Sequence, residues 1–358
     1  MAEKKIGKQT VKFEKSPYVI GAAAVGGKKE GQGPLCNCFD LILDDDMYGE
    51  KSWEKAESKM LKEAMLLALK KSGKEKGEID LVLSGDLLNQ IMSSSFMARD
   101  LQLPFLGLYG ACSTMTESLL LGAMLADGGF AHHIIIGASS HFCTAERQFR
   151  MPVEHGNQRP QTAQWTATAA GAMIVSENKA DFTQIGGIDS RQKIITPRNI
   201  RLDCGTIGKV IDAGVKDANQ MGSAMAPAAV DTILNHLEDT GRSFEDYDMV
   251  LTGDLGYIGK AIAADLLVDA GIDEKLVKAR YDDCGTMLYN RETQDVHGGG
   301  SGCGCSAAVF AGNTISKIRN GELNRVLLLS TGAMLSTISP FQGESIPGIA
   351  HGVVLEGC

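Results

Sequence analysis

An internal repeat limits the possible folds of this chain more than any other feature of its sequence. The segment Asp80-Leu-Val-Leu-Ser-Gly-Asp86-Leu returns, offset by 168 residues, as Asp248-Met-Val-Leu-Thr-Gly-Asp254-Leu. A second match, offset by 193 residues, aligns Cys112-Ser and the apolar run that follows it with Cys305-Ser and its own apolar run. Two matches in the same order indicate a duplicated unit. Related halves that pack together commonly hold a ligand site between them.

Length, composition and charge exclude several classes of protein. At 358 residues the chain has the length of about two domains. Its 44% hydrophobic and 22% charged residues are typical of a protein with a substantial core, and a net charge of -9 argues against a nucleic-acid partner. No apolar run reaches the roughly 18 residues of a membrane helix, and none follows the basic N-terminus. We therefore expect neither a membrane span nor a secretory signal.

Apolar periodicity predicts alternating helices and strands. The spacing of apolar residues predicts a helix over 53–71. Short apolar runs predict strands over 78–85, 104–110 and 133–137, and a helix begins near Cys112. Helices that alternate with short strands indicate an α/β fold with a largely parallel sheet. The nine cysteines, an odd number, indicate reduced thiols and no disulfide framework.

Cys112 has the sequence context most suggestive of chemistry. It stands between a predicted strand and a predicted helix, so its thiol should face free backbone N–H groups and the positive end of a helix dipole. Such surroundings stabilise a thiolate and create a nucleophile, and the same N–H groups also hold a carboxylate or phosphate. A buried, inert cysteine is the structural alternative, and the sequence leaves both open.

Five further features carry weaker signals. Asp86 and Asp254 end matched strands, where α/β sites usually form, but each is equally suited to capping the next element. The glycine-rich segment 298–305 could cradle an anion or form a tight turn. His297 and His351 stand beside glycine-rich segments as a base, a donor or a structural residue. We expect no resident metal, because the histidine and cysteine pairs lack zinc-site spacing.

Several longer segments resemble one known family. They are Ser84-Gly-Asp-Leu-Leu-Asn-Gln, Tyr109-Gly-Ala-Cys-Ser-Thr, Asp217-Ala-Asn-Gln-Met-Gly-Ser-Ala-Met-Ala-Pro and Glu344-Ser-Ile-Pro-Gly-Ile-Ala-His-Gly. They are similar to the stage V sporulation protein AD family of endospore formers, and the similarity runs from about residue 7 to 356. The resemblance implies the thiolase-like fold of condensing enzymes. Two βαβ-rich halves, here 1–178 and 179–358, then form five α-β-α-β-α layers, usually as a homodimer.

The resemblance implies binding and no catalysis. That family is the soluble part of the membrane-associated SpoVA apparatus, which moves dipicolinic acid into the forming spore and out at germination. The ligand would be dipicolinate, alone or with calcium, with no other cofactor. The partners would be the membrane subunits of that apparatus, so the protein would lie peripherally on the spore inner membrane through them.

The resemblance also assigns residues to the pocket. Cys112 falls on the nucleophile position of condensing enzymes, and the C-terminal glycine loop falls on 348–352. Dipicolinate is a flat dianion, which needs hydrogen-bond donors and an apolar slot. The predicted ligand-binding residues are Cys112, Asp86, Ser139, Ser140, Ser301, Gly302, Cys303, Cys305, Thr331 and His351. Asp86 would contact the ligand only through calcium.

Two departures from the condensing enzymes argue against turnover. Where many of them carry a histidine after the second-half strand, this chain reads Leu251-Thr-Gly-Asp254, and its glycine loop lacks their asparagine. Without a positioned base, Cys112 is a poor acyl carrier. Two alternatives stay open: an acyltransferase or condensing enzyme that uses Cys112 with His297 or His351, and a scaffold for membrane subunits.

Overall fold

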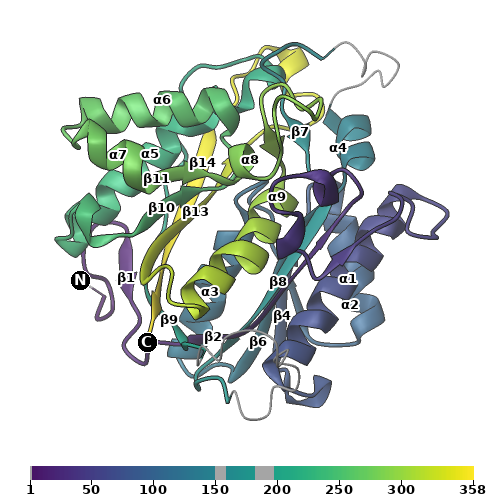
Figure 1. Ribbon diagram of the computed structural model, residues 1–358, viewed down its shortest axis with the longest axis vertical. Helices are drawn as coiled ribbons and strands as arrows, with labels where there is room; N and C mark the ends of the chain where they lie inside the picture. Colours follow the sequence, from purple (N-terminus) through teal and green to yellow (C-terminus); the bar gives the residue numbers. More distant parts are fainter. Residues whose placement is uncertain (1, 150–158, 182–196) are drawn as a thin grey trace.

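Two half-sheets of the same topology form the frame of the molecule (Figure 1). The computed structural model describes residues 2–149, 159–181 and 197–358. In spatial order, the first half-sheet consists of β5 (Phe105–Gly107), β4 (Leu81–Gly85), β6 (His133–Ser140), β8 (Ala169–Ser176) and β2 (Tyr18–Gly26). The second consists of β11 (Tyr281–Asp283), β10 (Met249–Thr252), β13 (Arg325–Ala333), β14 (Gly348–Gly357) and β9 (Ile200–Thr206).

Strand direction follows the same rule in both half-sheets. In each half-sheet three adjacent strands run parallel to one another, β5-β4-β6 in the first and β11-β10-β13 in the second. The remaining pairings are antiparallel, β6-β8 and β8-β2 in the first half-sheet and β13-β14 and β14-β9 in the second. The half-sheets are therefore mixed, and the prediction of a largely parallel sheet was wrong. The reason is that β8 and β14 each run antiparallel to both of their neighbours, so no parallel crossover connects them. The two half-sheets meet where Tyr18 of β2 pairs with Arg201 of β9.

Short strands supplement the half-sheets at their margins. β1 (Thr10–Lys12) pairs with β9, and β3 (Leu41–Ile42) pairs with β2. β7 (Trp165–Thr166) and β12 (Gly300–Ser301) form a two-stranded ribbon that joins the halves.

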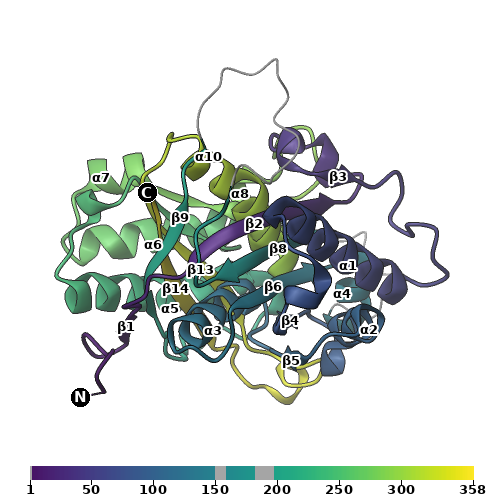
Figure 2. The same ribbon diagram turned by 90° about the horizontal axis from the view of Figure 1, so that it is seen from below.

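The helices make three layers around the sheets, as Figures 1 and 2 show. α1 (Trp53–Ser72) and α2 (Met92–Leu101) cover the outer face of the first half-sheet, and α5 (Met221–Thr240) and α6 (Gly256–Asp269) cover that of the second. Between the sheets lie α3 (Thr114–Asp127), α9 (Cys303–Ala308), a π-helical turn (Val309–Thr314) and α10 (Ile315–Arg319). This is the five-layer thiolase-like arrangement. The remaining helices are α4 (Phe142–Phe149), α7 (Glu274–Arg280) and α8 (Cys284–Met287).

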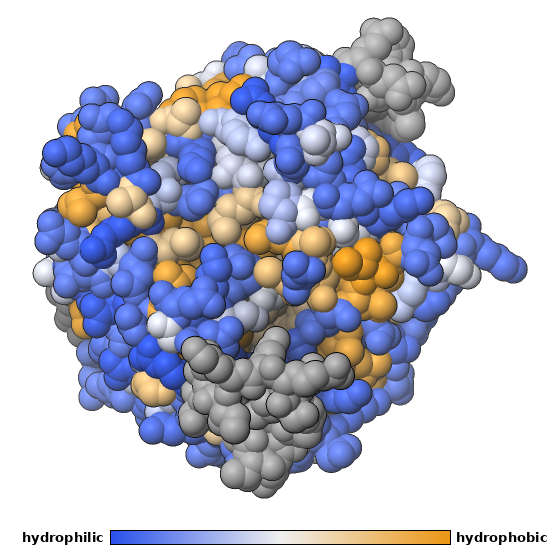
Figure 3. Space-filling model, viewed as in Figure 1, coloured by the Kyte–Doolittle hydropathy of each residue, from blue (hydrophilic) through white to orange (hydrophobic). Residues whose placement is uncertain are grey.

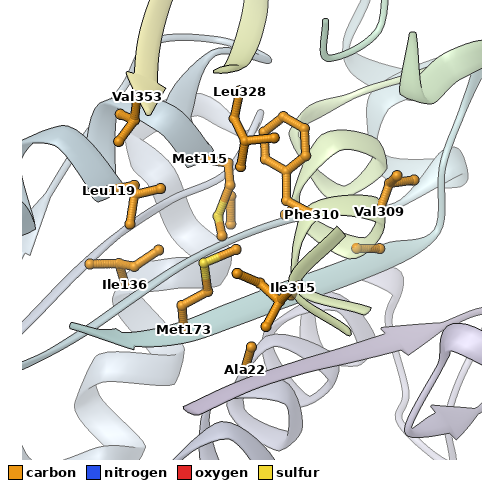
Figure 4. Close-up of a cluster of buried hydrophobic side chains, with 14 of the residues drawn as sticks. Ala22, Met115, Leu119, Ile136, Met173, Val309, Phe310, Ile315, Leu328 and Val353 are labelled. Atoms are coloured by element: carbon orange, nitrogen blue, oxygen red, sulfur yellow. The ribbon is translucent and has the colours of Figure 1, made fainter. Parts of the chain in front are cut away.

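The main core lies in the middle layer. Figure 4 shows Met115 and Leu119 of α3 directed toward side chains of both half-sheets, among them Ile136, Leu328 and Val353. All five are fully buried. Each buried side chain of this size contributes about 1.5–3 kcal/mol of transfer free energy, so the shared core holds the two halves together.

The predicted elements are largely present. The helix predicted over 53–71 is α1, which begins after the N-cap Ser52 and ends at Gly73, where φ is +71°. The helix predicted near Cys112 is α3. The domain boundary at 178/179 stays a prediction. Within the described part of the chain, no helix is both long and apolar enough to cross a membrane.

Backbone hydrogen bonds correct the register of the repeat. Ser113 N–H donates to Gly110 O, and Cys305 N–H donates likewise to Gly302 O, three residues back. Gly129 and Gly321 both have left-handed backbone, with φ of +76° and +78°. These landmarks are offset by 192 residues, one fewer than the sequence match predicted. Gly304, and not Cys305, therefore occupies the place of Cys112 in the second half.

Candidate functional site

A tight turn before α3 fixes Cys112. Ala111 has a left-handed φ of +50°, which is uncommon for a residue with a Cβ and marks local strain. Gly110 O accepts hydrogen bonds from Ser113 N–H at 3.0 Å and Ser113 Oγ at 2.7 Å. The turn places Cys112 two residues before the helix with only 6% of its surface exposed.

Cys112 lines a small cavity between the halves. Most of the wall is apolar, and the polar groups at its surface are Tyr109, Thr166 and Ser301 in addition to the thiol. The other lining residues are Leu87, Ala111, Ala145, Phe149, Met221, Ala333 and Leu335. The space open to the centre of a water molecule is about 30 Å³, which is room for about two waters. A ring ligand needs more space, so the wall must move to admit one.

Asp254 is a carboxyl buried behind the wall of this cavity, next to Ser301 and Cys112. It follows β10, is fully buried, and accepts hydrogen bonds from Thr331 Oγ1 at 2.8 Å and from Gly302 N–H at 2.8 Å. Ser301 Oγ lies 3.3 Å from the same carboxylate. The Cys112 thiol completes the set as a further donor, so Asp254 of the second half bonds to the thiol of the first.

Burial governs the protonation of this pair. Removal from water raises the pKa of Asp254 to about 6 although its hydrogen bonds lower it. Burial and the neighbouring Asp254 carboxyl raise the pKa of Cys112 well above that of an ordinary thiol. Of the two alternatives that the sequence left open, the raised pKa favours the buried, unreactive thiol over a stabilised thiolate, because burial and a carboxyl outweigh the helix start. Cys112 is a neutral thiol that donates to Asp254.

Asp86 lies in a second buried acidic cluster. Its carboxylate accepts from Leu88 N–H at 2.9 Å and Ser94 N–H at 2.7 Å, which is the capping alternative. Glu57 of α1 is its buried neighbour and accepts from Ser139 Oγ at 3.1 Å and Thr144 Oγ1 at 2.9 Å. Burial, and then repulsion by Asp86, raises the pKa of Glu57 to about 8. Asp86 is not among the residues that line the cavity.

Neither candidate histidine lines the cavity. His297 Nδ1 lies 3.0 Å from Pro160 O, and Nε2 lies 2.9 Å from Asp295. His351 Nδ1 accepts from Gly208 N–H at 3.1 Å, and burial lowers the pKa of this histidine to about 4. The C-terminal loop predicted over 348–352 is in fact the start of strand β14.

The glycine-rich segment 298–305 does precede a helix, but its donors are occupied. Gly302 N–H bonds to Asp254, and Gly304 N–H donates to Ser140 Oγ at 3.1 Å. The Cys303 thiol donates to Ser139 O at 2.8 Å. Cys305 is also fully buried, with its sulfur close to Gly300.

The structure thus divides the predicted ligand set. It brings Cys112, Ser301, Gly302 and Thr331 together around Asp254, but of the ten predicted residues only Cys112 and Ser301 line the cavity. That any of them binds a ligand stays a prediction. Sequence reasoning identified Asp254 through the repeat but left it out of the ligand set. A charged residue on the apolar face of the predicted helix 53–71 was the signal for Glu57.

Comparison with known proteins identifies both a family and a fold. The family model for stage V sporulation protein AD (SpoVAD) matches residues 7–356. Stage V sporulation protein AD of Bacillus subtilis (strain 168) is 44% identical over 350 residues, which cover 98% of this chain and 97% of that protein.

Solved structures of lower identity share the fold. 3-Oxoacyl-[acyl-carrier-protein] synthase III of Aquifex aeolicus VF5 superposes with a TM-score of 0.55 at 12% identity, covering 95% of this chain and 99% of that one. OleA of Xanthomonas campestris with bound cerulenin gives a TM-score of 0.58 at 14% identity, covering 96% and 97%. At such identities the likeness establishes the fold alone.

Proposed function

Because the chain belongs to the stage V sporulation protein AD family and has a role in sporulation, we propose that it binds dipicolinic acid without turning it over. The site would be the Cys112 cavity between the halves. One observation carries the proposal: Cys112 donates to the Asp254 carboxyl, with no imidazole among the described residues that line the cavity. A neutral thiol without a base suits contact with a ligand better than acyl transfer.

The lining of the cavity supports a flat, polar-edged ligand. Apolar side chains from both halves supply a slot for a ring, and the hydroxyls of Tyr109, Thr166 and Ser301 face its edge as donors to carboxylates. Burial raises the pKa of Tyr109 to about 12, so this phenol stays protonated. The apolar residues must shift to enlarge the present space, and Met221 and Leu335 have the flexible side chains to do so.

Asp254 makes binding depend on pH and on calcium. A dianion next to an ionised Asp254 is disfavoured, and the pKa of Asp254 near 6 means that this group ionises in the working range. Above pH 6 the affinity for dipicolinate alone should fall by about tenfold per pH unit, because binding must then take up a proton. Calcium supplied with the ligand should remove this dependence by neutralising the charge.

Calorimetric titration with dipicolinate tests the proposal, with and without calcium and with phthalate as a shape control. We expect about one site per chain, abolished by Cys112→Leu and unaffected by Cys358→Leu at an exposed position. Ala333→Leu fills the cavity from another wall and replaces the first variant if that one unfolds. Normal binding by a folded cavity-filling variant contradicts the site.

Acyl transfer is the competing outcome, since the fold is shared with a synthase. Intact mass after exposure to several acyl-coenzyme A donors distinguishes the two. An acyl adduct that forms on the wild type and not on Cys112→Ala would mean that the protein transfers acyl groups, and the proposal of binding without turnover would be wrong.

Docking to membrane subunits is a second part of the proposal. The face in Figure 3 is mainly hydrophilic with scattered apolar patches. Ile338 and Phe341, 58% and 81% exposed, belong to the segment that contributes Leu335 to the cavity wall. We propose that membrane partners cover this segment, which would couple docking to the cavity. Co-purification should weaken in Phe341→Ser and persist in Phe130→Ser, a change at an equally exposed phenylalanine.

A homodimer through β5 completes the proposal. β5 ends the first half-sheet and reads Phe-Leu-Gly with Leu106 53% exposed, whereas β11 ends the second and reads Tyr-Asp-Asp. An apolar edge favours pairing with another strand, and an acidic edge opposes it. Light scattering should therefore give a dimer for the wild type and a monomer for Leu106→Lys.

A further inference from the structure

A second cavity, separate from the one at Cys112, surrounds Trp165 of β7. Side chains alternate along a strand, so Trp165 faces this cavity while its neighbour Thr166 faces the Cys112 cavity. One face of the indole stacks on Phe142, with ring centroids 3.7 Å apart and planes at 8°. The other face of the indole is left for contacts with the cavity.

Two cations share that other face. Lys29 Nζ lies 3.6 Å from the centroid of the Trp165 ring, and Arg159 Cζ lies 4.8 Å from it. Each is attracted to the negative face of the ring. They also repel each other, because like charges above one ring are held close in a half-dry site. Burial and the Arg159 charge lower the pKa of Lys29, and Asp295 only partly offsets them.

The carboxylates of the cavity leave these cations under-compensated. Arg159 Nη2 bonds to Asp295 Oδ2 at 2.7 Å, but the Asp295 side chain is 69% exposed and also pairs with His297. Asp46 is the other carboxylate of the lining, which also contains Lys28 and Lys29, and Arg159 adds a third cation next to it. The buried Glu30 also acts on Lys29, but burial raises the pKa of Glu30 to about 7, so this carboxyl compensates the cations only in part.

Arg159 carries the strongest sign of a missing partner. Its side chain is 7% exposed, and its Nη1 is buried without a hydrogen-bond partner among the described residues. A buried guanidinium donor that is left unpaired destabilises the fold, because its lost hydration is not replaced. The groove, lined by Lys29, Trp165, Gln32 and Gln294 among others, has a volume of about 370 Å³, and Arg159 lies next to this lining against the Trp165 ring. An oxygen atom held in the groove by the Lys29 ammonium would meet Nη1 once the Arg159 guanidinium turns toward it.

We propose that this cavity binds an oxyanion, a carboxylate or phosphate group, bridged between Lys29 and Arg159 above the Trp165 ring. A planar guanidinium with one free N–H and an adjacent ammonium is the donor set that such groups prefer. The site does not depend on ligand binding at Cys112, because the two cavities lie on opposite faces of β7.

Tryptophan fluorescence tests the proposal directly. The chain has two tryptophans, so Trp53→Phe leaves Trp165 as the sole reporter. In that background, inorganic phosphate should change the emission in a saturable way. Lys29→Gln and Arg159→Gln should each weaken the apparent affinity by about tenfold or more, the size of one charge-assisted hydrogen bond. Arg159→Lys should weaken it less, since it keeps the charge and loses the fork.

Controls separate the site from general charge effects. Lys278→Gln, an exposed lysine paired with Glu274, should leave the titration unchanged. A second arm replaces phosphate with vesicles of phosphatidylglycerol and measures sedimentation. Binding of vesicles alone, lost in Lys29→Gln, identifies the oxyanion as a lipid headgroup. If neither phosphate nor vesicle binding depends on Lys29 or Arg159 in folded variants, the site does not exist.

Discussion

The two halves place matched aspartates in different chemical surroundings. Asp86 accepts two backbone N–H groups of its own half, whereas Asp254 accepts from Thr331 and Gly302 and bonds across the interface to Cys112. Both aspartates end equivalent strands, so the difference arises from what surrounds the strand ends and not from the strands.

One position on the outer helices explains the divergence. α1 and α5 each have 20 residues and end at Gly73 and Gly241, so Glu57 of α1 corresponds to Met225 of α5. In the first half, Ser139 donates to Glu57. In the second, the apolar Met225 offers no acceptor, and Thr331, the equivalent of Ser139, donates to Asp254. The buried Glu57 carboxyl therefore takes the Ser139 hydroxyl away from Asp86, and only in the second half does the equivalent hydroxyl donate to the strand-end aspartate, which lies next to Cys112.

The largest expected effect comes from removing each aspartate. Asp254→Ala leaves four buried donors without their acceptor, so we expect a loss of about 3–5 kcal/mol in the free energy of unfolding. Asp86→Ala also frees two N–H groups, but it ends the repulsion with Glu57, and we expect a loss of about 1–2 kcal/mol. Urea unfolding with unchanged slope measures both. Equal losses would show that the two carboxyls are equivalent after all.

The next effect concerns Cys112 and Gly304, which occupy equivalent places. A Cβ on Gly304 would lie 2.2 Å from Ala169 O and 2.7 Å from Ser140 Oγ. Because the closest atom belongs to the backbone, Gly304→Ala should cost about 3 kcal/mol. Cys112→Ala should cost about 1 kcal/mol, since its site is open to the cavity. Thermal or urea unfolding measures the pair, and a tolerated Gly304→Ala would contradict the close packing of Gly304 against Ala169 O.

The frame of the molecule could be predicted from the sequence, and the site only in part. The repeat and the apolar periodicity predicted α1, α3 and β4, because burial on one face leaves a regular pattern in sequence. The predicted register of the repeat was wrong by one residue at Cys305. The sequence match aligned Cys112 with Cys305 because both are cysteines, whereas the backbone turn makes Gly304 the equivalent of Cys112.

The electrostatics of the site could not be predicted. A cysteine before a helix reads as an activated thiol, yet the pKa of Cys112 is raised, because a carboxyl 142 positions away in sequence folds against it. Glu57 and Asp86 likewise stand far apart in sequence and meet only through the packing of α1 on the sheet. Burial and long-range contacts of this kind leave no periodic signal.

A smaller effect should appear in the pH dependence of stability, through Glu57 of the first half. Folded Glu57 holds its proton to about pH 8, and the unfolded chain releases it near 4.5. The stability from this group is therefore complete below pH 4.5 and is lost as the pH rises to about 8, at up to about 1.4 kcal/mol per unit. The free energy of unfolding of Glu57→Gln should stay constant over that pH range, whereas that of the wild type should fall. The difference in urea midpoint from pH 5 to 8 measures it, and parallel profiles would mean that Glu57 is ionised when folded.

The smallest effect on stability is expected at Asp80 and Asp248, where the two halves make equivalent hydrogen bonds. Asp80 Oδ2 accepts from His132 N–H at 2.6 Å and His133 N–H at 3.1 Å, and Asp248 Oδ2 accepts from Asn324 N–H at 2.6 Å and Arg325 N–H at 3.0 Å. Asp80→Ala and Asp248→Ala should each cost about 1 kcal/mol, because these N–H groups are near water and recover partners there.

Whether these two losses of stability are equal is a sharper test of the comparison between the halves. The two sites share no partner, so the double variant should lose the sum of the single losses within about 0.5 kcal/mol. Equal and additive losses would locate the divergence of the halves at the strand ends that face the cavity, where Asp86 and Asp254 differ. A gap above about 1.5 kcal/mol between the single variants would mean that the halves differ along the whole strand, and Glu57 would then be only one of several causes.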